Sequence, residues 1–326
     1  MPKKLRNIER LVLGMLEQDS RQSFSSIGRS IRKSQQRVSY TVNSMMQKGL
    51  IQSFYTLIDY SKLNVLNFRV HFRVNYTRGK RFEELVDYLV KHEQTGWVAA
   101  RGGKYDLVCT FFASNPSRFN KTWKGVLERF PEEIQDYNVM TTIVNLYFGR
   151  KYLNSNQHPP KIIVGGDRTP EKLDGIDMRI LRGLSESARA NSVKLGQDLS
   201  LAPKTVIDRM RKLKRRKIIL GFRSLISPSE MGWTSYLFFV KYHNVSSDVE
   251  NAFLAYLKAN PHVVRVVKTI GEWDTEAVIE VEDLTEMRRV EMEMRERFTA
   301  LVKDIAAAPL YRTYKNSFFP AFLAKQ

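Results

Sequence analysis

Cationic side chains are concentrated in one short segment of this sequence, where they could contact a polyanion. Residues 211–217 read RKLKRRK and are basic at every position except Leu213. A guanidinium group can grip a phosphate or the edge of a guanine with two hydrogen bonds, whereas a lysine offers a point charge. The simpler interpretation is a solvated, charged helix surface, which is common in proteins. The neighbouring residues help to decide between the two.

The residues before and within this run have the spacing of an amphipathic helix. Val206, Met210 and Leu213 lie at i, i+4 and i+7 and so form one apolar stripe. Pro203 stands where a first helical residue tolerates proline, because its missing N–H would have no partner there. The apolar positions in residues 218–226 then predict a short β-hairpin. A helix with one buried stripe and a basic outer face, followed by a hairpin, is typical of the reading head of a winged helix-turn-helix.

The outward-facing side chains of this helix divide into two groups. Those in its first half are placed to reach base edges, and those in its second half to meet phosphates. We expect Arg209 to grip a guanine, and Asp208 either to accept from cytosine or to orient Arg209. The expected base-side contacts are Lys204, Thr205, Asp208 and Arg209, and the expected phosphate contacts are Lys212, Lys214, Arg215 and Arg216. For each of them the alternative is a solvated polar side chain.

The composition also favours a nucleic-acid partner. The chain has 326 residues and a formal net charge of +19, from 53 Lys and Arg against 34 Asp and Glu. Such an excess favours nucleic acid first and an acidic membrane surface second. Apolar residues make up 43% of the chain, which is the content of a globular protein. The length predicts two or more domains.

The cysteine content and the lack of long apolar runs indicate a reducing compartment. The single cysteine, Cys109, excludes an internal disulfide and a cysteine-based zinc finger. We interpret it as a small buried hydrophobe. No apolar run approaches the roughly 20 residues of a membrane span, and the N-terminus lacks the apolar core of a signal peptide. We therefore expect a cytoplasmic protein.

The sequence repeats itself at a fixed distance. Adding 168 to the residue number takes Ile8 to Ile176 and Gly28 to Gly196. The same shift relates further pairs without a gap, among them Val38 and Val206, Phe54 and Phe222, Asp106 and Asp274, and Phe130 and Phe298. One offset that holds over most of each half predicts a tandem duplication of a two-part unit.

Each unit is predicted to contain two domains, which makes the fold class α+β. The first part has three helices and a hairpin, the winged helix-turn-helix pattern, at residues 1–62 and again at 173–230. The second part has the order β-α-β-β-α-β, the ferredoxin-like arrangement, at 63–153 and 231–326. Residues 154–172 contain three prolines, paired glycines and many polar residues, and we expect a flexible linker there.

The repeat and its element order resemble the Lrp/AsnC (leucine-responsive, feast/famine) family of transcription regulators. The resemblance rests on KLDGIDMRIL at 172–181 for the opening helix, and on RKIILGFRSLISPSEMG at 216–232 for the wing and linker. It also rests on GKYD at 103–106 and GEWD at 271–274, which match the family's glycine-aromatic-aspartate turn. It covers nearly the whole chain twice, and the tandem form resembles regulators of archaeal type.

The first unit departs from this pattern, so the two heads should differ. Its opening helix has Arg10 and Leu11 after Glu9 in place of the family's Asp-x-x-Ile run, and its reading helix, residues 34–47, is polar rather than basic. Gln35 and Gln36 could read adenine. The expected DNA contacts of this head are Gln35, Gln36, Arg37, Tyr40 and Thr41. We expect the head of the second unit to bind DNA more tightly.

The resemblance also implies an effector site and a mode of self-association. In the family the glycine-aromatic-aspartate turn borders a pocket for an amino acid or similar metabolite, which would involve Gly103, Tyr105, Asp106, Gly271, Trp273 and Asp274. The alternative is that each aspartate caps its own turn and that Tyr105 and Trp273 are core residues. The family's effector domains pair sheet against sheet. We expect the two copies of one chain to pair in this way, with two dissimilar pockets and with larger assemblies open.

Two other functions remain open at this stage. Siroheme decarboxylases use the same two-part unit and depend on histidines near the effector-domain pocket. Here none of the five histidines maps onto another under the 168 shift, and none has metal-ligand spacing. We therefore expect no enzyme, no metal and no cofactor. An architectural, chromatin-like DNA-binding protein without an effector is the closer alternative, and a steep salt dependence with low specificity would distinguish it.

Overall fold

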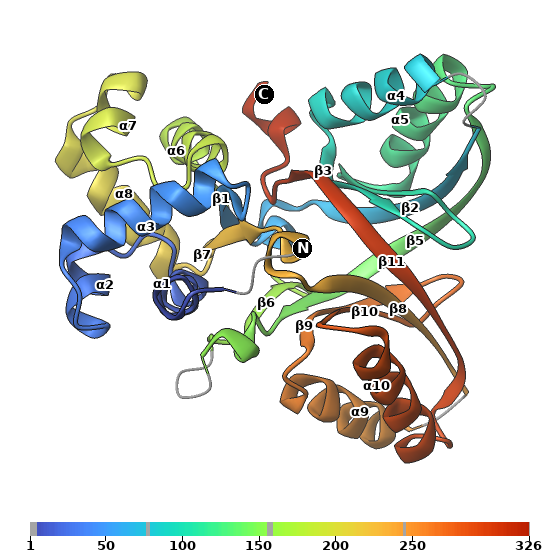
Figure 1. Ribbon diagram of the computed structural model, residues 1–326. Helices are drawn as coiled ribbons and strands as arrows, with labels where there is room; N and C mark the ends of the chain where they lie inside the picture. Colours follow the sequence, from blue (N-terminus) through green and yellow to red (C-terminus); the bar gives the residue numbers. More distant parts are fainter. Residues whose placement is uncertain (1–4, 76–78, 155–158, 244–245, 326) are drawn as a thin grey trace.

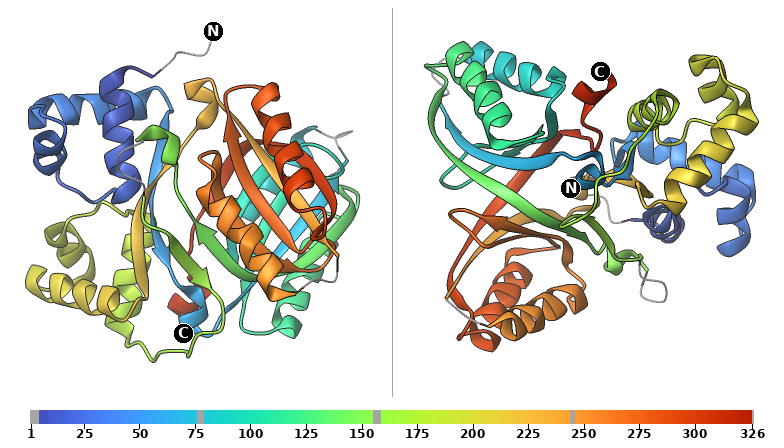
Figure 2. Two further views of the ribbon diagram at one scale, coloured as in Figure 1. Left: turned by 90° about the horizontal axis from the view of Figure 1, so that it is seen from below. Right: turned by 180° about the vertical axis from the view of Figure 1, so that it is seen from behind.

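The computed structural model describes residues 5–75, 79–154, 159–243 and 246–325. Two groups of three helices lie next to each other at one end of the molecule, and a large sheet with four further helices forms the rest (Figures 1 and 2). The first group contains α1 (Asn7–Gln18), α2 (Phe24–Ser30) and α3 (Gln35–Gln47), and the second contains α6 (Gly175–Glu186), α7 (Ser192–Leu199) and α8 (Pro203–Arg215).

The starts of these helices follow from local side-chain chemistry. Ser34 precedes α3 and its hydroxyl accepts a hydrogen bond from the Arg37 N–H at 3.1 Å. Asp174 precedes α6 and its carboxylate accepts one from the Asp177 N–H at 2.8 Å. In both cases the side chain satisfies an N–H that the helix itself leaves unpaired. Pro203 is the first residue of α8, as its fixed φ and missing donor predict.

The predicted apolar stripes face two separate cores. Val38 of α3 is fully buried together with Leu16 of α1. Val206 and Leu213 of α8 are fully buried together with Ile180 of α6. The stripe on α8 therefore faces inward and leaves the other side of this helix exposed.

The predicted hairpins after α3 and α8 are wrong. Each unit contributes one strand here, β1 (Ile51–Ile58) or β7 (Ile219–Ile226), and the two strands pair antiparallel with each other. Tyr55 lies opposite Arg223, and these two positions are related by the 168 shift. An unpaired strand would leave its backbone groups without partners, and the equivalent strand of the other unit supplies them. The two helical groups are thus joined by a two-stranded ribbon.

The rest of the strands form one nine-stranded sheet. The first unit contributes β2 (Leu66–Val74), β3 (Thr95–Arg101), β4 (Leu107–Ala113) and β5 (Ile134–Tyr147). The second contributes β8 (Thr234–Tyr242), β9 (Val263–Ile270), β10 (Thr275–Val281) and β11 (Val302–Asn316). The order is β2-β4-β3-β11-β8-β10-β9-β5, and because β5 also pairs with β2 these eight strands close into a ring. All of the pairings are antiparallel.

Helices cover the outer surface of the ring, and the interior of the ring contains a separate apolar cluster. The covering helices are α4 (Gly79–Lys91), α5 (Pro116–Arg129), α9 (Ser247–Ala259) and α10 (Leu284–Arg297), in two pairs (Figure 1). Phe72 and Phe238 pack in the cores under these pairs. Trp97, Val108 and Leu237 belong instead to a third cluster that gathers residues of both units inside the ring. On α10, Arg289 and Arg295 form i,i+4 ion pairs with Glu293 and Glu291.

The expected flexible linker is partly a strand. Residues 155–158 lie outside the described residues, but β6 (Ile162–Gly165) pairs antiparallel with β5, Val144 opposite Gly165. Val164 is fully buried, because the short apolar run IIV offers side chains that gain from leaving water. The linker therefore extends the sheet. None of the described helices is long and apolar enough to span a membrane.

Candidate nucleic-acid interface and effector cavity

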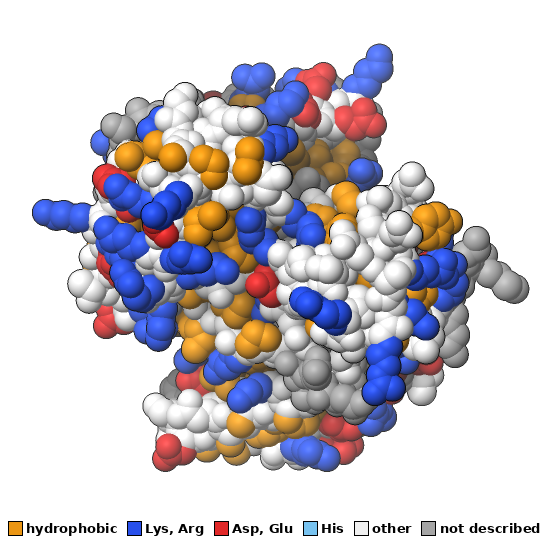
Figure 3. Space-filling view, turned by 90° about the vertical axis from the view of Figure 1, so that its left-hand side faces the viewer, with side chains coloured by type: hydrophobic (Ala, Val, Ile, Leu, Met, Phe, Trp, Pro, Cys, Tyr) orange, Lys and Arg blue, Asp and Glu red, His pale blue; other side chains and the backbone are white. Residues whose placement is uncertain are grey.

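The outer face of α8 is an exposed row of cationic side chains. Val206 and Leu213 face the core and the half-buried Met210 packs against it, which leaves the opposite side of the helix exposed. The exposed cations of this helix are Lys204, Arg211, Lys212, Lys214 and Arg215. Figure 3 faces the end of the molecule that carries the two helical groups, and Lys and Arg side chains gather on one half of this face. A surface of this kind matches a phosphate backbone.

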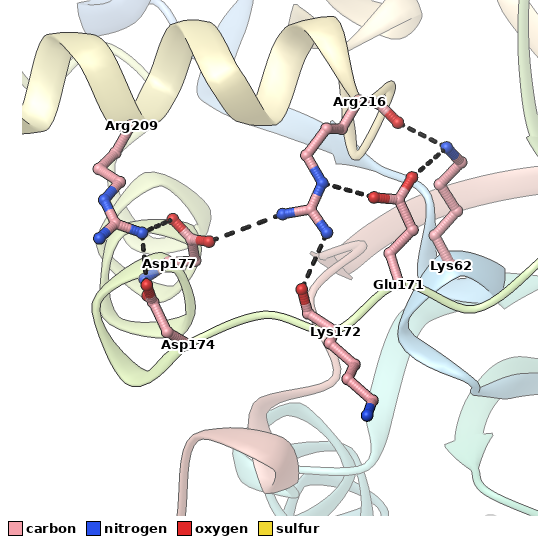
Figure 4. Close-up of polar contacts among 7 residues, drawn as sticks. All are labelled: Lys62, Glu171, Lys172, Asp174, Asp177, Arg209 and Arg216. Atoms are coloured by element: carbon pink, nitrogen blue, oxygen red, sulfur yellow. Dashed lines mark hydrogen bonds and ion pairs between the residues drawn. The ribbon is translucent and has the colours of Figure 1, made fainter.

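Two of the expected DNA contacts on α8 bind the protein itself (Figure 4). Nη1 of Arg209 donates to the carboxylates of Asp174 and Asp177 at the start of α6. Nε of Arg216 donates to Glu171 at 2.5 Å, and its Nη2 donates to the Lys172 carbonyl at 2.8 Å. These contacts hold α8 against the residues that lead into α6.

The contacts of Arg209 and its neighbour within the protein differ from those predicted. The backbone N–H of Asp177 and the Arg209 guanidinium hold the pKa of Asp174 below its usual range, so the acceptor of this ion pair is charged near neutral pH. Asp208 does not orient Arg209, since its carboxylate lies 3.3 Å from Nη1 of Arg211. Arg209 and Arg216 thus bind the segment that leads into α6, and Lys204 and Thr205 remain at the start of α8.

The outer face of α3 in the first head is polar, and four of the five predicted residues lie on it. Gln35, Gln36, Arg37 and Tyr40 are exposed on α3, as predicted. Thr41 is buried, with 1% of its surface exposed, and its hydroxyl donates to the Arg37 carbonyl at 2.8 Å. Position 41 falls three residues after the buried Val38 and so shares the inner side of the helix. Thr41 therefore does not belong to the outer face.

The two heads are held together by reciprocal contacts. Nη1 of Arg21 donates to the carbonyls of Ala188 and Ala190, at 2.5 and 2.8 Å. Arg189, which the 168 shift relates to Arg21, donates from Nη2 to the Gln22 carbonyl at 3.2 Å. Because each arginine binds the loop of the other head, the separation of α3 and α8 is fixed by the protein.

The two glycine-aromatic-aspartate turns meet at one cavity instead of forming two. The cavity has a volume of about 90 Å³ and lies where the turn between β3 and β4 approaches the turn between β9 and β10. Positions related by the 168 shift face each other across it, namely Lys104 and Glu272, Tyr105 and Trp273, and His71 and Phe239. The expectation of two separate pockets is wrong, because the pairing of the two units brings both turns to the same place.

Only some of the predicted effector residues line this cavity. Gly103, Tyr105 and Trp273 do so. Asp106 accepts a hydrogen bond from the Val74 N–H at 2.7 Å, and Asp274 accepts one from the Tyr242 N–H at 2.8 Å. The two carboxylates thus tie their turns to the neighbouring strands. Gly271 is not among the lining residues either, and its φ of +151° is a conformation that favours glycine.

A buried polar network under this cavity was not predicted. Glu276 of β10 accepts from Nε and Nη2 of Arg69 at 3.2 and 2.7 Å, and its Oε1 lies 3.0 Å from Nε2 of His71. Nη1 of Arg101 lies 2.8 Å from Nδ1 of His71. Arginine can only donate, so Nδ1 of His71 accepts and Nε2 carries the proton that binds Glu276. On β2 the side of the strand that carries Arg69 and His71 therefore also turns inward.

The charges of this network follow from burial and from the partners. Burial lowers the pKa of His71 in spite of the adjacent carboxylate, so the ring is neutral near pH 7. Burial alone would raise the pKa of Glu276, but Arg69 and the hydrogen bond from His71 hold it well below its usual range. Burial lowers the pKa of Arg101 to about 10, which leaves it charged near neutral pH. The charged residues that line the cavity are thus Arg101, Lys104 and Glu272, and the last two form an ion pair of 3.3 Å.

A second cavity of about 100 Å³ lies between the ribbon of β1 and β7 and the end of the ring that faces this ribbon. Arg150 donates there to Glu17 at 3.0 Å and to Glu280 at 2.9 Å. Arg265 stacks on Trp97, with its guanidinium carbon 4.5 Å from the ring centre. No sequence motif predicted this second cavity. Among the described residues, no three His, Cys, Asp or Glu side chains are arranged to hold a metal ion.

An exposed basic helix on a three-helix head defines the class of protein, a helix-turn-helix DNA-binding protein, and comparisons with known proteins specify it further. Residues 173–214 match the AsnC-type helix-turn-helix domain. The chain is 31% identical over 112 residues to the HTH-type transcriptional regulator Ptr1 of Methanocaldococcus jannaschii, which covers 34% of this chain and 74% of that protein. It is 32% identical over 104 residues to the leucine-responsive regulatory protein of Rhizobium meliloti, covering 32% of this chain and 67% of that protein.

The chain belongs to the Lrp/AsnC family and is a DNA-binding transcription regulator of that type. A solved structure is similar over nearly the whole chain. The siroheme decarboxylase NirDL aligns with 98% of this chain and 97% of its own, with a TM-score of 0.62 and 13% identity. At this identity the likeness concerns the fold.

Proposed function

We propose that this regulator reads duplex DNA with the exposed faces of α8 and α3, and that α8 supplies most of the affinity. The observation that carries this proposal is the row of five exposed cations on α8, opposed to the mostly polar outer face of α3. Phosphate contacts dominate affinity, so the head with more free cations binds more tightly. Lys212, Lys214 and Arg215 meet phosphates, and Lys204 and Thr205 lie nearest to base edges.

We also propose that the two halves of the chain are copies of one two-part unit, with boundaries near residues 62, 153, 172 and 230. The same order of helices and strands occurs twice, and Tyr55 and Arg223 of the ribbon pair across the point where the two copies meet. In this arrangement α3 and α8 approach DNA as two unlike halves of a dimer. The preferred duplex is then two dissimilar half-sites at a fixed spacing.

Selection of bound duplexes from a random pool tests this function. The proposal predicts enrichment of a bipartite sequence in which one half-site carries more information than the other. An architectural DNA-binding protein would show no enriched sequence, and this outcome would remove the sequence-specific function while leaving DNA binding intact. A pool of single-stranded molecules of the same length serves as the control for simple charge attraction.

We further propose that the cavity between the two turns binds a small effector that carries a carboxylate, such as an amino acid. Arg101 and Lys104 offer positive charge at its border, and Tyr105 and Trp273 offer apolar walls. A volume of about 90 Å³ is far below the roughly 300–1,000 Å³ of sites for larger ligands, so the effector is small. A tetrapyrrole does not fit this cavity, so the proposal does not extend to decarboxylation of such a substrate.

A calorimetric titration with single amino acids tests the effector site. The proposal predicts that one member of the series binds and changes the affinity for the selected duplex. Lys104→Ala should weaken this binding, whereas Lys91→Ala, which removes an exposed lysine on α4, should not. If no amino acid releases or absorbs heat, or if Lys104→Ala binds as the parent does, the cavity is not the effector site.

A further inference from the structure

We propose that the facing surfaces of the two units are charge-matched, so that each unit pairs with the other and rejects a copy of itself. Unit one here means residues 5–153 and unit two residues 173–325. The partner that the inner face of unit one fits is a unit with carboxylates at the positions of Glu272, Glu276 and Glu280. This property is separate from DNA binding and from the effector.

The two units pair with an approximate two-fold symmetry, so contacts on one seam can be compared with contacts on the other. On one seam Leu310 of β11 pairs with Arg101 of β3, and on the other seam Thr142 of β5 pairs with Thr269 of β9. The 168 shift converts the first pair into the second. Contacts between the units therefore tend to have counterparts at positions related by the shift. In a pair of identical units each contact and its counterpart would be the same.

The first mismatched contact is the buried pair of Arg69 and Glu276. The two side chains are 2% and 1% exposed and their closest atoms are 2.7 Å apart. The shifted positions hold Leu237 and Val108, which pack in the apolar cluster inside the ring. Two copies of unit one would place Arg69 against Val108 twice. Two copies of unit two would place Glu276 against Leu237 twice, and either pairing buries charges without partners.

The second mismatched contact is the ion pair of Arg150 and Glu280. Arg150 binds Glu280 with two hydrogen bonds of 2.9 Å, and both side chains are largely buried. The shifted positions hold Phe318 and Phe112, which are buried in one apolar cluster. A pair of identical units would again oppose a buried charge to a phenylalanine.

Contacts on the symmetry axis add direct repulsion. Lys104 and Glu272 are related by the shift and form an ion pair of 3.3 Å. Identical units would set lysine against lysine or glutamate against glutamate there. Arg223, which is 4% exposed, lies opposite Tyr55 in the ribbon, and two copies of unit two would bring two buried arginines to this place. Like charges that face each other directly oppose pairing.

A relocation of one carboxylate tests the proposal in the full chain. The variant Val108→Glu with Glu276→Val moves the partner of Arg69 from unit two to unit one without changing the net charge. Zero-length crosslinking with a carbodiimide reports the pairing, because Lys104 and Glu272 form a contact only when unlike units meet. The proposal predicts loss of most of this crosslink, and interchain contacts of unit one in a mixture of isotope-labelled and unlabelled chains.

The matched control exchanges the charges of the axis pair. Lys104→Glu with Glu272→Lys keeps unlike units complementary, so the mass in solution, the melting temperature and a zero-length crosslink within one chain should stay as in the parent. If the relocated variant keeps the Lys104–Glu272 crosslink within one chain and the parent's melting temperature, the charge-matching proposal is wrong.

If the relocated variant does not fold, a set of apolar replacements tests the charge-matching proposal instead. Arg69→Leu and Glu276→Val each remove one partner of the buried ion pair and leave the other without its opposite charge, and the melting temperature should fall by several degrees in each. The double variant reproduces the apolar arrangement of Leu237 and Val108, and it should regain most of the loss. A double variant that is no more stable than the two single variants overturns the proposal, since partner choice rests on the cost of an unpaired charge.

Discussion

Removal of three cations from α8 offers a quantitative test of the DNA interface. The perturbation is Lys212→Ala, Lys214→Ala and Arg215→Ala in one chain, all at exposed positions with no apolar stripe residue among them. Each phosphate contact contributes about 0.9 to the slope of log K against log salt. Three lost contacts flatten the slope by about 2.7. Between 50 and 200 mM salt, a fourfold change, the ratio of parent to variant affinity should shrink by about 40-fold.

The assay is fluorescence anisotropy with the selected duplex at several salt concentrations. The control variant is Arg118→Ala, Lys121→Ala and Lys124→Ala, which removes three exposed cations from α5, away from the heads. It changes the net charge equally, so it isolates position from total charge. An unchanged slope in the α8 variant, or an equal flattening in the α5 control, would refute the assignment of this face to DNA.

Two further predictions concern residues that the structure places inside the protein. Arg209→Ala should leave the preferred bases of the selected duplex unchanged, because Arg209 binds Asp174 and Asp177; a relaxed preference at one base pair, seen in a repeated selection, would restore the base-reading role. Acidification below the ordinary His pKa of 6.5 should lower the urea midpoint, because the unfolded chain takes up a proton that buried His71 resists. The loss grows as the pH falls, and Glu276, whose folded pKa is also lowered, adds a loss of the same sign at lower pH. His71→Phe, the residue found at position 239, should flatten the dependence between pH 7 and 5, and an unaltered dependence would contradict the assigned role.

The sequence predicted the parts of the fold that depend on periodicity within one element. The stripe of Val206 and Leu213, the exposed row on α8 and the two β-α-β-β-α-β orders all follow from spacing along the chain. The exposed side of α3 was also predicted, except at Thr41. Thr41 lies three residues after Val38 and therefore on the same buried side of the helix, which the prediction did not take into account.

The parts that depend on contacts between the two units could not be read in this way. The sequence of a strand such as β2, with Phe72 on one face and His71 on the other, indicates one buried face and one solvent-exposed face. The ring of strands places the polar face inside, and only the other unit supplies its partners. The same is true of β1 and β7, which looked like local hairpins. The ion pairs of Arg209 were not predicted, because their acceptors lie at the start of α6, 35 and 32 residues earlier in the chain.

The central claim is that one chain holds two unequal DNA-reading heads at a fixed distance. The most direct measurement is a hydroxyl-radical footprint of one chain on its selected duplex at rising salt. The account predicts two protected patches at constant spacing, of which the one contacted by α3 disappears at lower salt than the one contacted by α8. A single patch, or two patches that disappear together, would contradict it.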